Sequence, residues 1–271
     1  MTYVRDDIRT QWEGLDPMAT AFALDGEVFR AVPGRRTLRV EIGDRMYFVK
    51  LHYGVGWREI FKNWLQLKKP VVGAANEYLA CVGLQDEGIV APIPAAFAES
   101  SGGIATRKSF VLCDELDGYL SLEDVTDEWD TLPPSPLAKH RLLYAVARFA
   151  KAFHTAGFIH RDFYICHLLA QTDALERGVV ELAVLDLHRA RRFVQIPRRW
   201  LLRDLAALLF STLDLGYSQR DWFRFIRAYT GEPLQASFRS NEKFWLDVLK
   251  RAHRLYAEGQ REGIVKNRYT P

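Results

Sequence analysis

A stretch of twelve residues, FIHRDFYICHLL at 158–169, places ionisable side chains inside an otherwise apolar frame. The residues before it, 136–156, carry apolar side chains at helical spacing, and Ser135 and Gly157 are suited to begin and end that helix. Burying a charge is costly unless the charge is paired or used. The chain must therefore fold around a polar loop that directly follows a long helix.

The pattern along the chain predicts two different halves. Short strands are expected at 27–32, 37–42 and 46–51, separated by turn residues, and they form an antiparallel meander. Helical patterns follow at 57–69 and 75–88, then strands near 109–116 and 179–187, and helices from Trp200 onward. We expect an α+β fold of one domain, with an antiparallel-sheet N-terminal lobe (1–116) and a helical C-terminal lobe (117–271).

Composition narrows the class of protein. Of the 271 residues, 48% are hydrophobic, which is enough for a packed core, and the net charge of +3 does not indicate a nucleic-acid binder. The three cysteines are far apart, so a disulfide framework or zinc knuckle is not expected. No apolar run is long enough to span a bilayer, and the N-terminus lacks a signal-peptide core. These features predict a soluble cytoplasmic protein, with attachment to a membrane surface left open.

Phosphoryl transfer requires a small set of charged groups, and the chain offers one of each in a suitable order. Lys50 lies in a predicted strand and could hold phosphates, and Glu77 lies on a later helix and could hold Lys50. Asp162 in the HRD triplet could position an attacking hydroxyl. Asp186 stands at the end of an apolar strand, which is a common position for a metal ligand. Glu59 is a rival partner for Lys50, and an ordinary surface ion pair is the alternative interpretation of Lys50 and Glu77.

The order of several segments resembles a known family. The segments are RRTLRV, YFVKLHYGVGW, SFVLCDEL, HTAGFIHRDFYICHLL, LDLHRAR and RRWLLRDLAAL, and they cover nearly the whole chain. In these segments the chain resembles the bacterial lipopolysaccharide core heptose (I) kinases, within the eukaryotic-protein-kinase-like fold. The combination of HRDFYICH with DLHRA is specific, whereas an isolated HRD is not. The resemblance implies a bilobal protein-kinase-like fold.

The resemblance also implies roles for individual residues. Asp162 matches the aspartate that accepts the proton of the substrate hydroxyl, and Asp186 matches a Mg²⁺ ligand. Lys50 and Glu77 match the pair that anchors the ATP phosphates, and Asp204 matches an aspartate that braces the catalytic loop.

Three further positions follow from the same resemblance. Glu115 and Leu116 lie where backbone groups would meet adenine. His167 stands where protein kinases carry a metal-binding Asn, and it is either a metal ligand or a brace of the loop, because Mg²⁺ prefers oxygen ligands. His160 is expected to support the loop by packing and hydrogen bonding.

The chain departs from protein kinases in ways that bear on its substrate. The loop at 31–40 has only Gly34 instead of a GxGxxG motif, and only 18 residues separate Asp186 from Asp204, with no APE motif. A segment that short cannot dock a peptide in the usual way, so we expect a sugar or a lipid-borne acceptor. The 27 residues from Lys50 to Glu77 leave room for an inserted helix at 57–69.

The predicted function is ATP- and Mg²⁺-dependent phosphorylation of a heptose hydroxyl in the lipopolysaccharide inner core, at the cytosolic face of the inner membrane. The basic, tryptophan-bearing segment 57–69 either packs on the core or contacts the anionic membrane surface. The basic run at 189–192 and 197–199 is either solvated or contacts an acidic saccharide. No nucleic acid is expected, and the sequence predicts no particular protein partner.

Alternatives from other classes remain at this point. A related small-molecule or protein kinase would share the fold. A pseudokinase would bind without transferring phosphate. A non-haem iron oxygenase could use HRD with His188 or His253 as a facial triad, but that triad normally lies on a jelly roll of strands.

Overall fold

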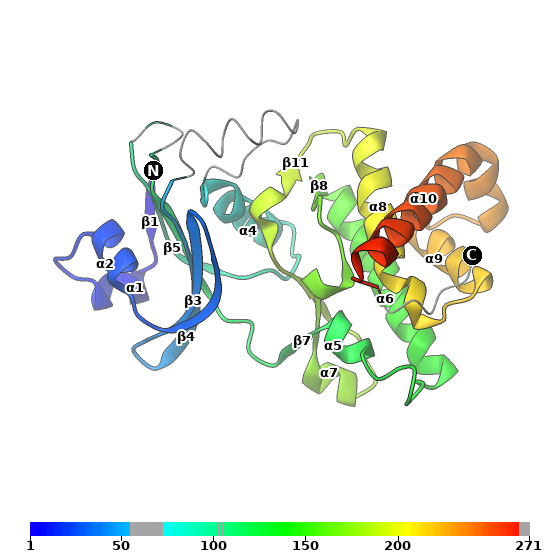
Figure 1. Ribbon diagram of the computed structural model, residues 1–271, viewed down its shortest axis with the longest axis horizontal. Helices are drawn as coiled ribbons and strands as arrows, with labels where there is room; N and C mark the ends of the chain where they lie inside the picture. Colours follow the sequence, from blue (N-terminus) through cyan, green and yellow to red (C-terminus); the bar gives the residue numbers. More distant parts are fainter. Residues whose placement is uncertain (55–72, 102, 104–105, 266–271) are drawn as a thin grey trace. The chain divides into compact units, whose positions relative to one another are not determined.

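The computed structural model describes residues 1–54, 73–101, 103 and 106–265, and the predicted helix at 57–69 and Glu59 lie outside these ranges (Figure 1). The chain divides into two compact units. One is Met1–Asp117 with Asp186–Arg189, and the other is Gly118–Leu185 with Ala190–Pro271. The expected boundary after residue 116 differs from this division at Asp117 and at Asp186–Arg189. The latter segment belongs to the first unit because hydrogen bonds from Lys50 and Asn76 hold it there.

The first unit is built on a six-stranded antiparallel sheet with the order β1-β5-β6-β4-β3-β2. Its strands are β1 (Thr2–Val4), β2 (Glu27–Val32), β3 (Arg35–Ile42), β4 (Arg45–His52), β5 (Pro94–Glu99) and β6 (Ser109–Asp114). The predicted meander is confirmed as β2, β3 and β4. In β4, Tyr47, Val49 and Leu51 alternate into the core, so Lys50 between them points to the opposite face.

Helices accompany this sheet, and two of them were not predicted. They are α1 (Asp6–Gln11), α2 (Pro17–Ala23) and α4 (Ala75–Asp86). From α1 and α2, Ile8 and Ala21 join the buried cluster that includes Val40 and Phe110 of the sheet. Helices α1 and α2 are too short to give a clear periodic pattern, so the sequence does not predict them. Their stability depends on packing against the sheet. Helix α4 confirms the pattern predicted at 75–88, with Gly88 just beyond its end at φ 68°.

The second unit is mainly helical. Its helices are α5 (Leu122–Thr126), α6 (Pro136–Thr155), α7 (Thr172–Glu176), α8 (Arg198–Thr212), α9 (Gln219–Thr230) and α10 (Leu234–Glu262). Two small antiparallel sheets join β7 (Tyr119–Ser121), β9 (Leu168–Gln171) and β10 (Leu182–Val184), and β8 (Phe158–Ile159) with β11 (Arg191–Arg192). Figure 1 shows α8 beside α10 in this unit, and these two helices pack against each other.

Helix α6 directly precedes the polar loop, as the sequence predicts. The Ser135 side chain accepts the Ala138 N–H at its start. Gly157 follows its end at φ 85°, where a Cβ atom would lie 2.3 Å from the Phe193 carbonyl oxygen. The strand expected at 179–187 is present as β10, which is shorter than expected, with three residues. Within the described residues, every helix is too short or too polar to cross a lipid bilayer.

Candidate active site

The predicted site residues fall into two groups, one in each unit. In the first unit, β4 carries Lys50 and α4 carries Glu77, and the Lys50 Nζ donates to Glu77 Oε1 at 2.5 Å. The same ammonium group donates to Asp186 Oδ1 at 3.2 Å. Glu77 is only 4% exposed, so this pair is not an ordinary surface ion pair. The predicted partnership of Lys50 with Glu77 is therefore present in the structure.

The charge of Lys50 is maintained by its two acidic neighbours. Burial by itself would lower the pKa of Lys50, but the negative charges of Glu77 and Asp186 outweigh burial and raise it. The other carboxylate oxygen of Glu77, Oε2, is buried without a hydrogen-bond partner in the described part of the chain. A cation held in this way is suited to pair with phosphate oxygens.

Asp186 has an unusual backbone conformation and a second donor. Its φ is 55°, in the left-handed region that non-glycine residues rarely adopt. The His188 Nδ1 donates to Asp186 Oδ1 at 2.7 Å, and the Asn76 side chain donates to the His188 carbonyl oxygen at 2.9 Å. Helix α4 thus fixes both Lys50 and the Asp186 turn. Sequence reasoning did not assign His188 this part, although its place in DLH was the available signal.

In the second unit, the HRD triplet forms a turn after β8. The buried Asp204 on α8 accepts the backbone N–H of His160 at 2.6 Å and that of Arg161 at 2.8 Å. Arg161 has a φ of 74°. Arg161 and Asp186 are the only non-glycine residues with positive φ in the described ranges. The expected brace from Asp204 is present, and it supports the residue just before Asp162.

Two histidines organise the same loop. The fully buried His160 donates from Nε2 to the Leu185 carbonyl oxygen at 2.7 Å, as expected for a supporting residue. Burial lowers the pKa of His160, which therefore stays neutral. The His167 ring stacks on His160 with centroids 5.4 Å apart, and its Nδ1 donates to the Asp162 carbonyl oxygen at 2.7 Å. His167 therefore braces the loop, and any metal bond from it would have to use Nε2.

The segment expected to meet adenine begins where β6 ends. The Glu115 N–H donates to the Met46 carbonyl oxygen at 3.2 Å, so a backbone contact from Glu115 to a nucleotide would use its carbonyl oxygen. The Glu115 carboxylate accepts from Arg39 Nη2 at 2.9 Å. Leu116 follows Glu115 in the chain, and its predicted role in binding adenine stays a prediction.

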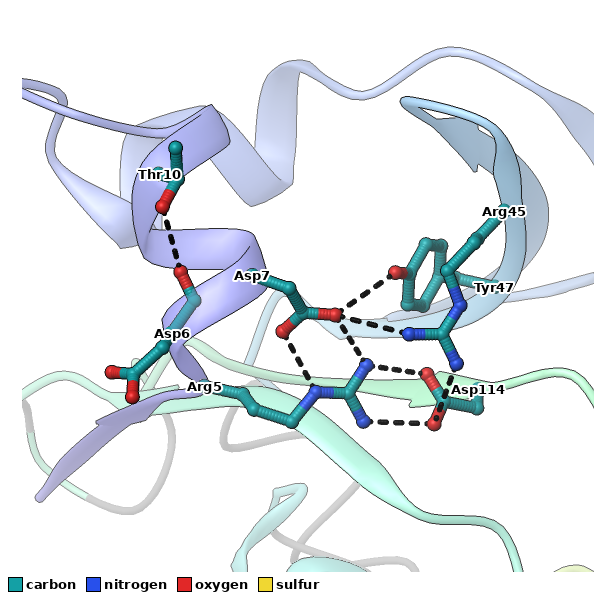
Figure 2. Close-up of polar contacts among 7 residues, drawn as sticks. All are labelled: Arg5, Asp6, Asp7, Thr10, Arg45, Tyr47 and Asp114. Atoms are coloured by element: carbon teal, nitrogen blue, oxygen red, sulfur yellow. Dashed lines mark hydrogen bonds and ion pairs between the residues drawn. The ribbon is translucent and has the colours of Figure 1, made fainter.

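A pair of arginines fixes Asp114, the residue before Glu115, and we call Arg5 and Arg45 the arginine clamp. Figure 2 shows the Arg5 guanidinium between Asp114 and Asp7, with two hydrogen bonds of 2.7 to 2.8 Å to each carboxylate. Arg45 lies 3.2 Å from Asp7 and 3.5 Å from Asp114. The hydrogen bonds from Arg5 lower the pKa of Asp7 to about 2. Sequence reasoning missed this network because its members are far apart in the chain.

The predicted metal-binding residues fit an ion that takes most of its ligands from the substrate and from water. No group of three or more His, Cys, Asp or Glu side chains that could hold a metal ion occurs in the described residues. Mg²⁺ in phosphate chemistry is commonly bound by one or two carboxylates together with substrate phosphates and water. The Asp186 carboxylate is an oxygen donor of that kind. The Nδ1–H of His167 donates to a carbonyl oxygen, so its Nε2 carries the lone pair, as in an imidazole that binds a metal.

Comparison with known proteins identifies the family. The family model of the lipopolysaccharide kinase (Kdo/WaaP) family matches residues 20–229. The chain belongs to the lipopolysaccharide kinase (Kdo/WaaP) family. It is 41% identical over 261 residues to the lipopolysaccharide core heptose(I) kinase WaaP of Pseudomonas aeruginosa, covering 96% of this chain and 97% of that protein. It is 37% identical over 265 residues to the WaaP of Escherichia coli K12, covering 97% of this chain and all of that protein.

One solved structure agrees with the Kdo/WaaP family, and a second agrees with the fold. A structure of WaaP in complex with acyl carrier protein matches with a TM-score of 0.82 and 36% identity, covering 94% of this chain and 99% of that chain. The BubR1 kinase domain matches with a TM-score of 0.51 and 11% identity, covering 85% of this chain and 84% of that domain. The predicted α+β, protein-kinase-like fold is confirmed. The jelly roll required by the iron-oxygenase alternative is contradicted.

Proposed function

We propose that this protein is an ATP-dependent kinase that phosphorylates a heptose hydroxyl of the lipopolysaccharide inner core. The observation that carries the proposal is the buried Lys50–Glu77 pair with Asp186 at the same ammonium group, in a chain of the Kdo/WaaP family. The relatives at 37 to 41% identity are named as heptose(I) kinases of this core. A related small-molecule or protein kinase is the alternative, because the acceptor is not visible in the residues themselves.

The proposed roles follow from the charge and placement of each group. Lys50 neutralises phosphate oxygens of ATP, and Glu77 keeps Lys50 charged and oriented. The carboxylate of Asp162 accepts the proton of the sugar hydroxyl as its oxygen bonds to the γ-phosphorus and the bond to the leaving ADP oxygen breaks. Glu115 and Leu116 hold adenine through backbone groups.

The chain's own residues also prepare a metal site. Mg²⁺, when bound, would offset the negative charge that develops on the phosphate groups during transfer. Asp186 would hold the ion through its carboxylate, and Lys50 and His188 orient that carboxylate. His167 is the proposed second ligand.

The acceptor determines where the protein would work. A lipid-borne saccharide is presented at a membrane surface, so we place the enzyme in the cytoplasm, in peripheral contact with the cytosolic face of the inner membrane. This placement rests on the chemistry of the proposed acceptor. Segment 57–69, whose tryptophan and basic residues suggested such contact, lies outside the described residues.

An acyl carrier protein is the proposed protein partner. The support is the structural relative solved in complex with acyl carrier protein. The helical unit also contains a cavity of about 510 Å³ lined largely by apolar side chains, including Leu142, Val146, Leu205, Leu208 and Trp245. Such a cavity has the size and chemistry to take an acyl chain. Filling it with Val146→Trp should abolish co-purification of acyl carrier protein, and unchanged co-purification would contradict this partnership.

The test of the kinase proposal is transfer of labelled phosphate from ATP to unphosphorylated core lipopolysaccharide, with mapping of the phosphorylated hydroxyl. Asp162→Ala should reduce transfer at least about 10²-fold while leaving nucleotide binding intact. Asp173→Ala removes an exposed acid of α7 in the same unit and should leave transfer unchanged. Full activity of Asp162→Ala would contradict the proposed mechanism. A wild-type protein that binds ATP and transfers nothing would be a pseudokinase.

A further inference from the structure

A cluster of arginines surrounds Trp200 in the helical unit. The guanidinium carbon of Arg203 lies 4.8 Å from the centre of the Trp200 ring system, that of Arg161 lies 5.2 Å away and that of Arg199 lies 5.8 Å away. Each contact is a favourable cation–π interaction, but together they bring three like charges to one side chain. The indole therefore holds guanidinium groups in place beside the HRD turn.

Two arginines of helix α10, Arg251 and Arg254, extend this cluster on the side of Arg203. Burial, and then the positive charges of Arg203 and Arg254, lower the pKa of Arg251. Tyr164 and Glu258 act in the opposite direction and do not cancel the effect. The pairing of α8 with α10 in the fold brings these residues together, as Figure 1 shows for the two helices.

Three of these arginines, Arg203, Arg251 and Arg254, have no acidic partner among the described residues. Within the described chain, no carboxylate lies within ion-pair distance of Arg203, Arg251 or Arg254. The Arg251 Nε atom is buried and has no hydrogen-bond partner there. A buried donor without a partner and a set of like charges both cost stability, so the cluster is disfavoured by folding alone. Clustered cations of this kind indicate a site for a negatively charged ligand.

The cluster borders the catalytic loop of the same unit. Arg161, which contacts Trp200, is the residue before Asp162. Tyr164, which is near enough to Arg251 to affect its pKa, is two residues after Asp162. A ligand held by the cluster would therefore be a part of the molecule whose hydroxyl Asp162 activates.

We propose that Arg203, which contacts Trp200 on α8, forms a subsite together with Arg251 and Arg254 of the neighbouring helix α10, and that this subsite binds an anionic group of the acceptor saccharide, a carboxylate or a phosphate. This inference rests on the proposed function and assigns the recognition of the acceptor to named residues. Guanidinium groups bind both anions through paired hydrogen bonds. The half-buried position of Arg251 suits a small anionic group better than the flat surface of an acidic protein.

The test compares three single variants, Arg203→Gln, Arg251→Gln and Arg254→Gln, with Arg220→Gln as the control. Arg220 is an exposed arginine of α9, outside the cluster, and its replacement makes the same change of charge. Each cluster variant should raise the KM for core lipopolysaccharide about tenfold and leave the KM for ATP unchanged. The control should change neither value. Cluster variants that behave like the control would overturn the inference.

Modified acceptors separate the two sources of negative charge. If a carboxylate is the ligand, an acceptor whose carboxylates are reduced to alcohols should show the same KM with wild-type and variant enzymes. If a phosphate is the ligand, a dephosphorylated acceptor should instead show the same KM with wild-type and variant enzymes. Variants that retain their tenfold defect with an acceptor lacking both groups would contradict the subsite.

Two further measurements keep the outcomes distinct. Without acceptor, Arg254→Gln should raise the Tm, because it removes one of the repelling charges, whereas loss of a structural contact would lower it. Loss of binding to acyl carrier protein with an unchanged KM for the acceptor would show that the cluster is a protein-docking surface and overturn the inference. Failure of the wild-type enzyme to transfer phosphate would contradict the proposed function. Normal transfer with an unaffected acceptor KM in all three variants would contradict only the subsite.

Discussion

The Asp204 carboxylate accepts the backbone N–H of Arg161 at 2.8 Å, and this contact supports a residue in the left-handed backbone region. A non-glycine residue in that region is strained by about 1 kcal/mol or more, so the turn needs outside support. Asp204 supplies it from α8, where its side chain is fully buried. The position of Asp162, one residue further on, depends on this support.

Removal of the Asp204 carboxylate should therefore affect both folding and catalysis. Asp204→Ala leaves the buried N–H of His160 and the partly buried N–H of Arg161 without this acceptor, and the buried group alone should cost about 1–3 kcal/mol of unfolding free energy. Asp204→Asn retains one acceptor oxygen and should cost less. Urea unfolding measures the stability, and the kcat of the Asn variant should fall with little change in nucleotide affinity. Wild-type stability of Asp204→Ala would show that the brace is dispensable.

Replacing Glu77 tests the buried pair in the first unit. Glu77→Gln keeps the shape of the side chain but leaves Lys50 with Asp186 as its charged partner, which draws the ammonium away from phosphate. We expect kcat/KM for ATP to fall about 10²-fold, in line with the loss of one charged positioning contact. Asp86→Asn changes an exposed acid of the same helix and should be neutral. Equal effects of the two substitutions would contradict the role of Glu77.

The arginine clamp should contribute to stability through Arg5. Arg5→Ala removes four hydrogen bonds to Asp7 and Asp114 and should lower the unfolding free energy by about 1–3 kcal/mol. Arg5→Lys should recover only part of the loss, because an ammonium group cannot pair with both carboxylates in this geometry. The matched control is Arg9→Ala, whose partner Asp6 is exposed, and its effect should be within about 1 kcal/mol. A large loss in the control alone would contradict the clamp.

His52 should make the stability depend on pH. Burial, followed by the charges of Arg35, Lys50 and His188, lowers its pKa in the folded state to about 3. An unfolded histidine has a pKa of about 6.5, so between these values the unfolded chain binds the extra proton. The stabilising effect is complete above pH 6.5 and is lost by up to about 1.4 kcal/mol per pH unit as the pH falls. Urea unfolding from pH 7 to 4 should show a shallower loss for His52→Gln, and parallel curves would contradict this assignment.

Local patterns were sufficient for much of this protein. Strands β2, β3 and β4 followed from alternation and turn residues, and α6 followed from apolar spacing with a serine cap and a terminal glycine. The HRD and DLH segments indicated phosphoryl transfer because their residue types meet its electrostatic needs. Each of these signals is contained within a few consecutive residues, where backbone preference and side-chain period act directly.

The remaining features depended on tertiary structure. The arginine clamp joins residues more than one hundred positions apart, and the arginine cluster that begins at Trp200 draws on the catalytic loop, α8 and α10. The segment Asp186–Arg189 joined the first unit through Lys50 and Asn76, against the boundary that local pattern suggested. Such contacts are set by which elements pack together, and no local periodicity encodes that choice. Charged residues that look solvated in the sequence form a buried ion pair and a cluster of arginines only because the helices and strands that carry them pack together.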